Sequence, residues 1–92
     1  MSGGVLNSRA IHLPKPRYPP NARNLRAAGL VTVEVTLDEE GKVISARAVD
    51  GNAFLKEAAV EAARQARFTP TLVSGKPVQV IGVITYKFSL AR

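Results

Sequence analysis

The residues of this sequence that could carry out chemistry are one histidine and two small groups of acids, and none is spaced for catalysis. His12 stands alone in a proline-rich stretch, where a lone histidine is typically solvated, and no Ser-His-acid set can be assembled around it. Residues 38–40 are consecutive acids, whereas a calcium loop needs ligands at spaced positions. Glu57 and Glu61 lie one helical turn apart, but no histidine stands at a spacing that would complete a metal site.

Phosphate and thiolate chemistry are not indicated either. The stretch "SGKP", residues 74–77, contains the Gly-Lys pair of a phosphate-binding loop, yet Pro77 replaces the required Ser or Thr and residue 70 is not glycine. The 92 residues include no cysteine, so neither a disulfide framework nor a thiolate zinc site can form. We therefore expect a small binding module with no enzymatic activity, no metal and no cofactor.

Positive charge is concentrated in the first third of the chain, whose formal net charge is +6 at pH 7. Five basic residues precede the first acid, Glu34: Arg9, Lys15, Arg17, Arg23 and Arg26. Such a surface attracts phosphates, anionic lipid headgroups or acidic peptides. Arg17, Arg23 and Arg26 are candidates for steering an acidic partner, and a basic nucleic-acid-binding module is the main rival interpretation.

No apolar run approaches the roughly 18 residues of a spanning helix, and the first residues lack a secretory signal pattern. We expect a soluble fragment with no membrane contact of its own. Residues 1–17 are expected to be a flexible, partly proline-rich tail, and residues 18–92 a folded domain. The prolines lead into a helix of two to three turns over "NARNLRAAG", with Gly29 as its left-handed stop.

Strand patterns follow this helix. Residues 30–38 alternate apolar and polar side chains, and Gly41 supplies the positive φ of a hairpin turn into residues 42–49, whose less regular alternation allows a bulge. Asn52 is the expected N-cap of an alanine-rich helix over residues 53–67. Residues 78–90 carry the longest strand pattern, with the even-numbered side chains on one face.

This order of elements predicts an α+β domain: a three-stranded antiparallel sheet of order 2-1-3 with two helices packed on one face. The last strand then lies on an edge and is unprotected, because it contains one charge, Lys87, and no proline. An open edge can bind a peptide as an additional strand. At about 0.5–1.5 kcal/mol net for each main-chain bond, such binding is weak and reversible.

Three alternatives compete with an open edge: the N-terminal tail, the C-terminus or a second copy of the chain covers it. In the last case the protein is a self-pairing dimerisation domain. Gly82 can mark a bulge that partly protects the strand. Tyr86 and Phe88 share a face with core-type residues, and burial of both rings would argue against a nucleic-acid stacking platform.

Six pieces of the sequence occur together in a familiar order: "YP", "A...LRAAG", "VTVEVTLDEEGKV", "AAVEAARQARFTP", "SGKPV" and "YKFSL". From Tyr18 to Leu90 they resemble the C-terminal domain of TonB-family energy transducers. A full transducer also carries a membrane anchor and a long proline-rich linker, of which only "LPKPRYPP" is echoed here. Ala66 stands where the family often has tryptophan.

The resemblance implies a periplasmic domain whose parent protein is anchored in the inner membrane. Its implied partner is the Ton box, a short peptide near the N-terminus of outer-membrane transporters, which adds as a strand beside the last strand of the sheet. We expect no nucleic-acid partner, and either a monomer or a strand-paired homodimer. The implied peptide-facing residues are Val83, Ile84, Thr85, Tyr86, Lys87, Phe88 and Ser89, with Tyr18 and Pro19 close by. The hypothesis requires that one flank of the last strand be vacant.

Overall fold

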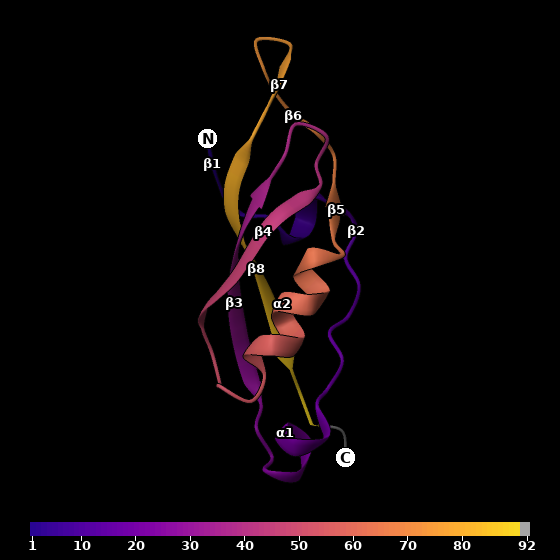
Figure 1. The fold of residues 1–92 in the computed structure, drawn as a ribbon, viewed down its shortest axis with the longest axis vertical. Helices are drawn as coiled ribbons and strands as arrows, with labels where there is room; N and C mark the ends of the chain where they lie inside the picture. The colour runs from indigo at the N-terminus through magenta and orange to yellow at the C-terminus, as the bar shows by residue number, and fades with distance from the viewer. Residues whose placement is uncertain (91–92) are drawn as a thin grey trace.

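A computed structural model describes residues 1–90; the last two residues of the predicted domain, 91 and 92, lie outside the described residues. The molecule is elongated, with extents of 49 × 20 × 16 Å, and α2 lies across one face of the main sheet while α1 lies at one end (Figure 1). The elements are β1 (Ser2–Val5), η1 (Asn7–Arg9), β2 (Ala10–His12), α1 (Pro20–Asn24), β3 (Gly29–Leu37), β4 (Val43–Asp50), α2 (Lys56–Arg64), β5 (Arg67–Phe68), β6 (Thr71–Val73), β7 (Lys76–Val78) and β8 (Val80–Phe88).

The main sheet has the order β1-β8-β3-β4. β3 pairs antiparallel with both β4 and β8. The α+β class is confirmed and the three predicted strands are neighbours as β4-β3-β8, but the predicted three-stranded sheet of order 2-1-3 differs from the four-stranded sheet observed. The predicted number of strands is wrong, because β1 pairs in parallel with the other flank of β8 at Ile81, Gly82 and Val83. β8 is therefore an interior strand over its first half, and its flank is not vacant there.

The core lies between the sheet and α2. The odd-numbered residues of β3 are buried from Val31 to Leu37, as their alternation predicts, and so are the even-numbered residues of β8. α2 contributes small side chains such as Ala59 and Ala63, which let the helix lie close to the strands.

α1 is shorter than its sequence pattern predicts and does not end at Gly29. Arg26 takes the left-handed conformation, with a φ of 56°. The N–H of Arg26 donates to the carbonyl of Arg23, and the N–H of Ala27 donates to that of Ala22 at 2.8 Å. These are the two hydrogen bonds of a Schellman motif, which ends the helix one turn early because it satisfies the last carbonyls.

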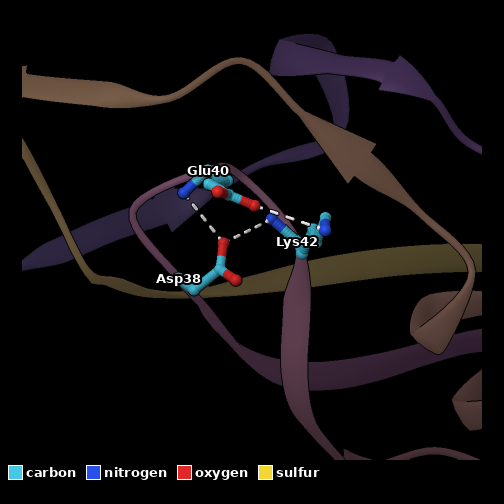
Figure 2. A network of polar contacts seen from close by, with 3 residues as sticks. All are labelled: Asp38, Glu40 and Lys42. Carbon is cyan, nitrogen blue, oxygen red and sulfur yellow. Dashed lines mark hydrogen bonds and ion pairs between the residues drawn. The ribbon is translucent and has the colours of Figure 1, made fainter.

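The hairpin between β3 and β4 has the predicted glycine turn. Gly41 has a φ of 84°, and a Cβ there would collide with the carbonyl oxygen of Phe68 in β5. Asp38 Oδ1 accepts hydrogen bonds from the N–H groups of Lys42 and Glu40, each at 2.9 Å (Figure 2). The pKa of the Asp38 carboxyl group is lowered, chiefly by the hydrogen bond from the Lys42 N–H. Acids in this turn therefore have a local structural role. The bulge expected in β4 is confirmed by two shifts in its pairing with β3.

Two other local predictions are corrected by the structure. Asn52 is not the N-cap of α2; its Oδ1 accepts from the N–H of Phe54 at 2.8 Å, and Leu55 precedes the helix. Asn52 therefore forms a turn of its own, because a short amide side chain readily bonds the backbone two residues ahead. The residues before Val80 belong to a separate hairpin, β6–β7, whose "SGKP" turn has positive φ at Ser74 and Gly75.

The first seventeen residues, predicted as a tail, contain β1, η1 and β2 in the structure. β2 pairs antiparallel with β5, where Ala10 lies opposite Phe68. Neither helix in residues 1–90 combines the length and the apolar character needed to cross a bilayer.

Candidate functional site: the outer flank of β8

The main-chain groups of β8 alternate between two neighbours. Antiparallel pairing with β3 uses the groups of every second residue. The main-chain groups of Ile81, Val83 and Thr85 bond to residues on the other side, so they and, by the same alternation, those of Lys87 point to the outer flank. We define these four residues as the outer flank of β8. This flank is the candidate site, because a further strand can pair only there.

Residues 1–7 occupy most of the outer flank. The N–H of Ile81 donates to the carbonyl of Met1 at 2.7 Å, and the N–H of Leu6 donates to the carbonyl of Val83 at 2.8 Å. Asn7 continues the pairing with its side chain instead of its backbone: Nδ2 donates to the Thr85 carbonyl at 2.7 Å, and Oδ1 accepts from the Thr85 N–H at 2.9 Å. The chain therefore already holds a parallel strand at this flank.

Gly82 makes room for this strand. A Cβ on Gly82 would lie 2.7 Å from the Gly4 carbonyl oxygen and 2.8 Å from Cγ and Cδ1 of Leu6. The side chain of Leu6 is fully buried in the core. The pairing of β8 with β3 runs without a shift through Gly82, so the predicted bulge in β8 is wrong; the glycine serves as a notch for Leu6 instead.

The last part of the outer flank has no such neighbour. Within residues 1–90, no hydrogen-bond partner is found for the outer main-chain groups of Lys87. A groove of about 350 Å³ lies beside it. The residues that line this groove come from the end of β8 and from the extended chain before α1: Leu13, Pro14, Lys15, Pro16, Tyr18, Thr85, Tyr86, Lys87, Phe88 and Ser89.

The predicted site residues of β8 divide into two sets. Ile84, Tyr86 and Phe88 are buried in the core, so their side chains are not available to a partner. Val83 and Thr85 have outer main-chain groups that are already paired, and Lys87 and Ser89 are exposed beside the groove. Because Tyr86 and Phe88 are both buried, they cannot form a stacking platform for bases.

Tyr86 is also the one buried side chain in residues 1–90 whose polar atom lacks a hydrogen-bond partner. Burial raises the pKa of its hydroxyl to about 12. The hydroxyl contributes nothing to the outer flank, and its unmet hydrogen bond costs stability.

Tyr18, one of the two residues expected beside the peptide-binding strand, lies next to the end of β8. The Tyr18 ring meets the Phe88 ring edge to face, with centroids 5.5 Å apart, and its hydroxyl donates to the carbonyl of Ala27. Pro19 precedes the first turn of α1. Tyr18 therefore attaches the chain before α1 to the last residue of β8, Phe88.

The three arginines proposed for steering have different local surroundings. The Arg23 guanidinium stacks over the Tyr18 ring, 4.7 Å from its centroid. Arg26 provides the left-handed residue after α1. Arg17 lines a second cavity together with Glu57 and Glu61 of α2. All three are exposed near α1.

The N-terminal tail was one of three alternatives for covering this edge, but sequence reasoning assigned no strand to it and so missed β1 and its extension, residues 2–7. Their pairing joins positions 78 residues apart, such as Asn7 and Thr85, and a short segment with two glycines has no strand periodicity. The available signal was the glycine in β8, since a glycine in an unbulged strand also marks close approach of another backbone. No group of acids and histidines in residues 1–90 is arranged to hold a metal ion.

Comparisons with known proteins agree on one family. Residues 14–90 match the family described as "Gram-negative bacterial TonB protein C-terminal". "Protein TonB" of Vibrio cholerae serotype O1 (strain ATCC 39315 / El Tor Inaba N16961) is 36% identical over 66 residues, which are 70% of this chain and 27% of that protein. The chain thus spans about a quarter of the length of this curated relative.

The fold is also similar to a solved structure, the "Solution NMR structure of Pseudomonas aeruginosa TonB CTD". The TM-score is 0.72 at 23% sequence identity, and the match covers 97% of this chain and 95% of that chain. On the strength of the family match over residues 14–90, this chain belongs to the family of Gram-negative bacterial TonB C-terminal domains.

Proposed function

We propose that this domain is the peptide-binding part of a TonB-like energy transducer in the periplasm, whose parent protein is anchored in the inner membrane. It binds the Ton box of an outer-membrane transporter as an additional strand on the outer flank of β8. Because β1 and Asn7 already pair with this flank at Ile81, Val83 and Thr85, the vacant flank among the described residues is limited to Lys87, and the peptide must displace the N-terminal segment from the rest. Membership of the family supports this role. The observation that carries it is that the outer flank already accepts an extended segment through main-chain bonds at Ile81 and Val83.

The chemistry of the flank determines how such binding works. Main-chain N–H and C=O groups bind any extended peptide, so affinity comes from the ladder and selectivity comes from the alternate side chains. The apolar part of the groove beside Lys87 comes from Leu13, Pro14 and Pro16 in the chain before α1. A peptide with apolar residues at alternate positions fits these surroundings. Arg17, Arg23 and Arg26 would speed its approach if it is acidic, because exposed charges act mainly on association rates.

A titration with transporter peptides tests the proposal. The probes are synthetic peptides that cover the N-terminal segments of outer-membrane transporters, with scrambled versions as controls. We expect the amide signals of Ile81, Val83, Thr85 and Lys87 to shift with the native peptides only. Shifts confined to Arg17, Arg23 and Arg26 would instead indicate a partner bound by charge.

Two variants of Lys87 distinguish the contribution of its main chain to peptide binding from that of its side chain. Lys87→Pro removes an N–H group that faces outward, so it should leave the pairing with β3 in place and weaken peptide binding. Lys87→Ala keeps this N–H and should bind as the wild type does. Equal binding by both variants would mean that the peptide does not pair with the flank at Lys87.

A further inference from the structure

We propose that residues 2–7 act as an internal plug strand, which competes with any foreign strand for the outer flank of β8. The inference rests on the proposed function, because it concerns the same flank. Its content is different: the protein in its resting state is mostly closed at Ile81, Val83 and Thr85, and a partner has to displace a segment of the same chain.

The plug strand pairs with the main-chain hydrogen-bonding groups of the outer flank almost as a peptide ligand would. Met1, directly before the plug strand, offers its carbonyl to the N–H of Ile81. Within the strand, Leu6 offers an N–H to Val83, and the amide of Asn7 supplies both a donor and an acceptor to Thr85. The Asn7 side chain thus reproduces the two groups of a peptide unit. A foreign strand cannot form these bonds while the plug strand is in place, since each main-chain group on this flank has one neighbour position.

The attachment depends on one deeply placed side chain. Leu6 is fully buried, whereas Val5 is 59% exposed. Leu6 enters the space left by Gly82, and Gly3 is limited in size by contacts with Val80 and Leu6 itself. The notch and the side chain fit each other, so the plug strand has a specific register on β8 and is not a randomly placed tail.

Other features make this strand easy to release. β1 has four residues, of which three are exposed. Two of the four residues are glycines, which lose more backbone entropy on ordering than other residues. Gly4 has a φ of 63°, and the pairing register shifts between Ser2 and Gly4. The family match starts at residue 14, so the plug strand lies upstream of the matched part of the domain.

The end of β8 gives a foreign strand a place to begin. The outer groups of Lys87 are free within the described residues, and the adjacent bonds of the plug strand are those of Asn7 with Thr85. A peptide that pairs first at Lys87 therefore meets a side-chain contact, and not a continuous ladder, as the first barrier. Displacement then proceeds from Thr85 towards Ile81.

The test uses the full chain and the substitution Gly4→Pro. Proline cannot adopt the positive φ of Gly4, so the substitution should detach the plug strand, and a Cβ at this position meets no atom within 4 Å. The matched control is Gly75→Pro, which makes the same change at a positive φ in the remote β6–β7 turn. Asn7→Ala is a second, milder variant that removes only the contacts with Thr85.

The first readout uses a peptide of the chain itself. An acetylated peptide of residues 1–9 is added to each labelled protein, and amide exchange of Ile81 and Thr85 is measured before and after. We expect fast exchange in Gly4→Pro, recovery of protection with the added peptide, and no response of wild type or Gly75→Pro. Slow exchange of both amides in Gly4→Pro and in Asn7→Ala would overturn the proposal.

The second readout separates the plug strand from the proposed function. Transporter peptides should bind Gly4→Pro about ten- to a hundredfold more tightly than wild type, as expected if the flank is open in about 1–10% of wild-type molecules. Equal affinities would overturn the plug strand while leaving the proposed function intact. If no transporter peptide binds any protein but the peptide of residues 1–9 restores protection, the plug strand stands and the proposed function fails. In a mixture of two differently labelled samples, contacts between Leu6 of one molecule and Gly82 of another would show that the strand comes from a second copy. That result would overturn an internal plug.

Discussion

The fit between Leu6 and Gly82 can be measured with a double-mutant cycle. Leu6→Ala removes a fully buried side chain, which should lower the free energy of unfolding by about 2–5 kcal/mol. Gly82→Ala places a methyl group 2.8 Å from two carbons of Leu6, an overpacking that costs about 1–3 kcal/mol. In the double variant the new methyl enters space that Leu6 has vacated, although its contact with the Gly4 carbonyl, at 2.7 Å, remains.

We therefore expect the double variant to be more stable than the sum of the single losses predicts, by about 1–2 kcal/mol. The same sign follows if the plug strand detaches in either single variant, because the second substitution then has little left to disturb. Urea unfolding of the four proteins, followed by circular dichroism, measures the coupling. Leu6→Ala combined with Gly75→Ala serves as the control, since Gly75 has open space around it and the two losses should add within about 0.5 kcal/mol. Additivity of Leu6→Ala and Gly82→Ala would refute the notch.

Four further predictions concern the rest of the domain. Gly41→Ala should destabilise the protein in thermal unfolding by at least about 2–4 kcal/mol, because its Cβ meets a backbone oxygen of β5, whereas Gly75→Ala in open space should cost about 1–2 kcal/mol. Tyr86→Phe should raise the free energy of unfolding by about 1–2 kcal/mol, since it removes a buried hydroxyl without a partner in residues 1–90. The Tyr86 pKa rises from 10.0 to about 12 on folding, so the unfolded chain binds fewer protons in this interval; stability should fall from pH 10 to 12, and less so in Tyr86→Phe. Arg26→Gly should stabilise α1 by about 1 kcal/mol in urea unfolding, because glycine adopts the left-handed conformation without strain. The Asp38 pKa is lowered by folding, so its stabilising effect is present above pH 3.8 and should be lost below it, and Asp38→Asn should remove that part of the acid dependence.

Local patterns were sufficient for the elements that form the core. Alternation of Val31 to Leu37 predicts β3 because a strand with one buried face needs a period of two. Gly41 and the acids before it predict the hairpin, since turn chemistry is set by neighbouring residues. The order of these elements along the chain then restricts the sheet to few topologies, which is why the central order β4-β3-β8 could be predicted.

Errors arose where a distant segment or a competing local bond decided the outcome. The helix stop at Arg26 depends on two capping bonds that any residue type can make with its backbone, so Gly29 was the more obvious but incorrect choice. β1 depends on packing of Leu6 against a strand near the other end of the chain. Such a pairing has no periodic signal in four residues, and only the complementary notch at Gly82 points to it.

The plug strand also explains how β8 can lack protective residues in its own sequence. A long strand with one charge invites pairing with other chains, and proteins usually add prolines or charges to prevent it. Prolines or extra charges in β8 itself would block the flank that the proposed function needs. A detachable segment of the same chain protects the flank at Ile81, Val83 and Thr85 and still leaves it usable. The selectivity of the flank then has two sources: the fit of a peptide to the notch and groove, and the requirement that it bind more strongly than residues 2–7 do at the high effective concentration of a tethered segment.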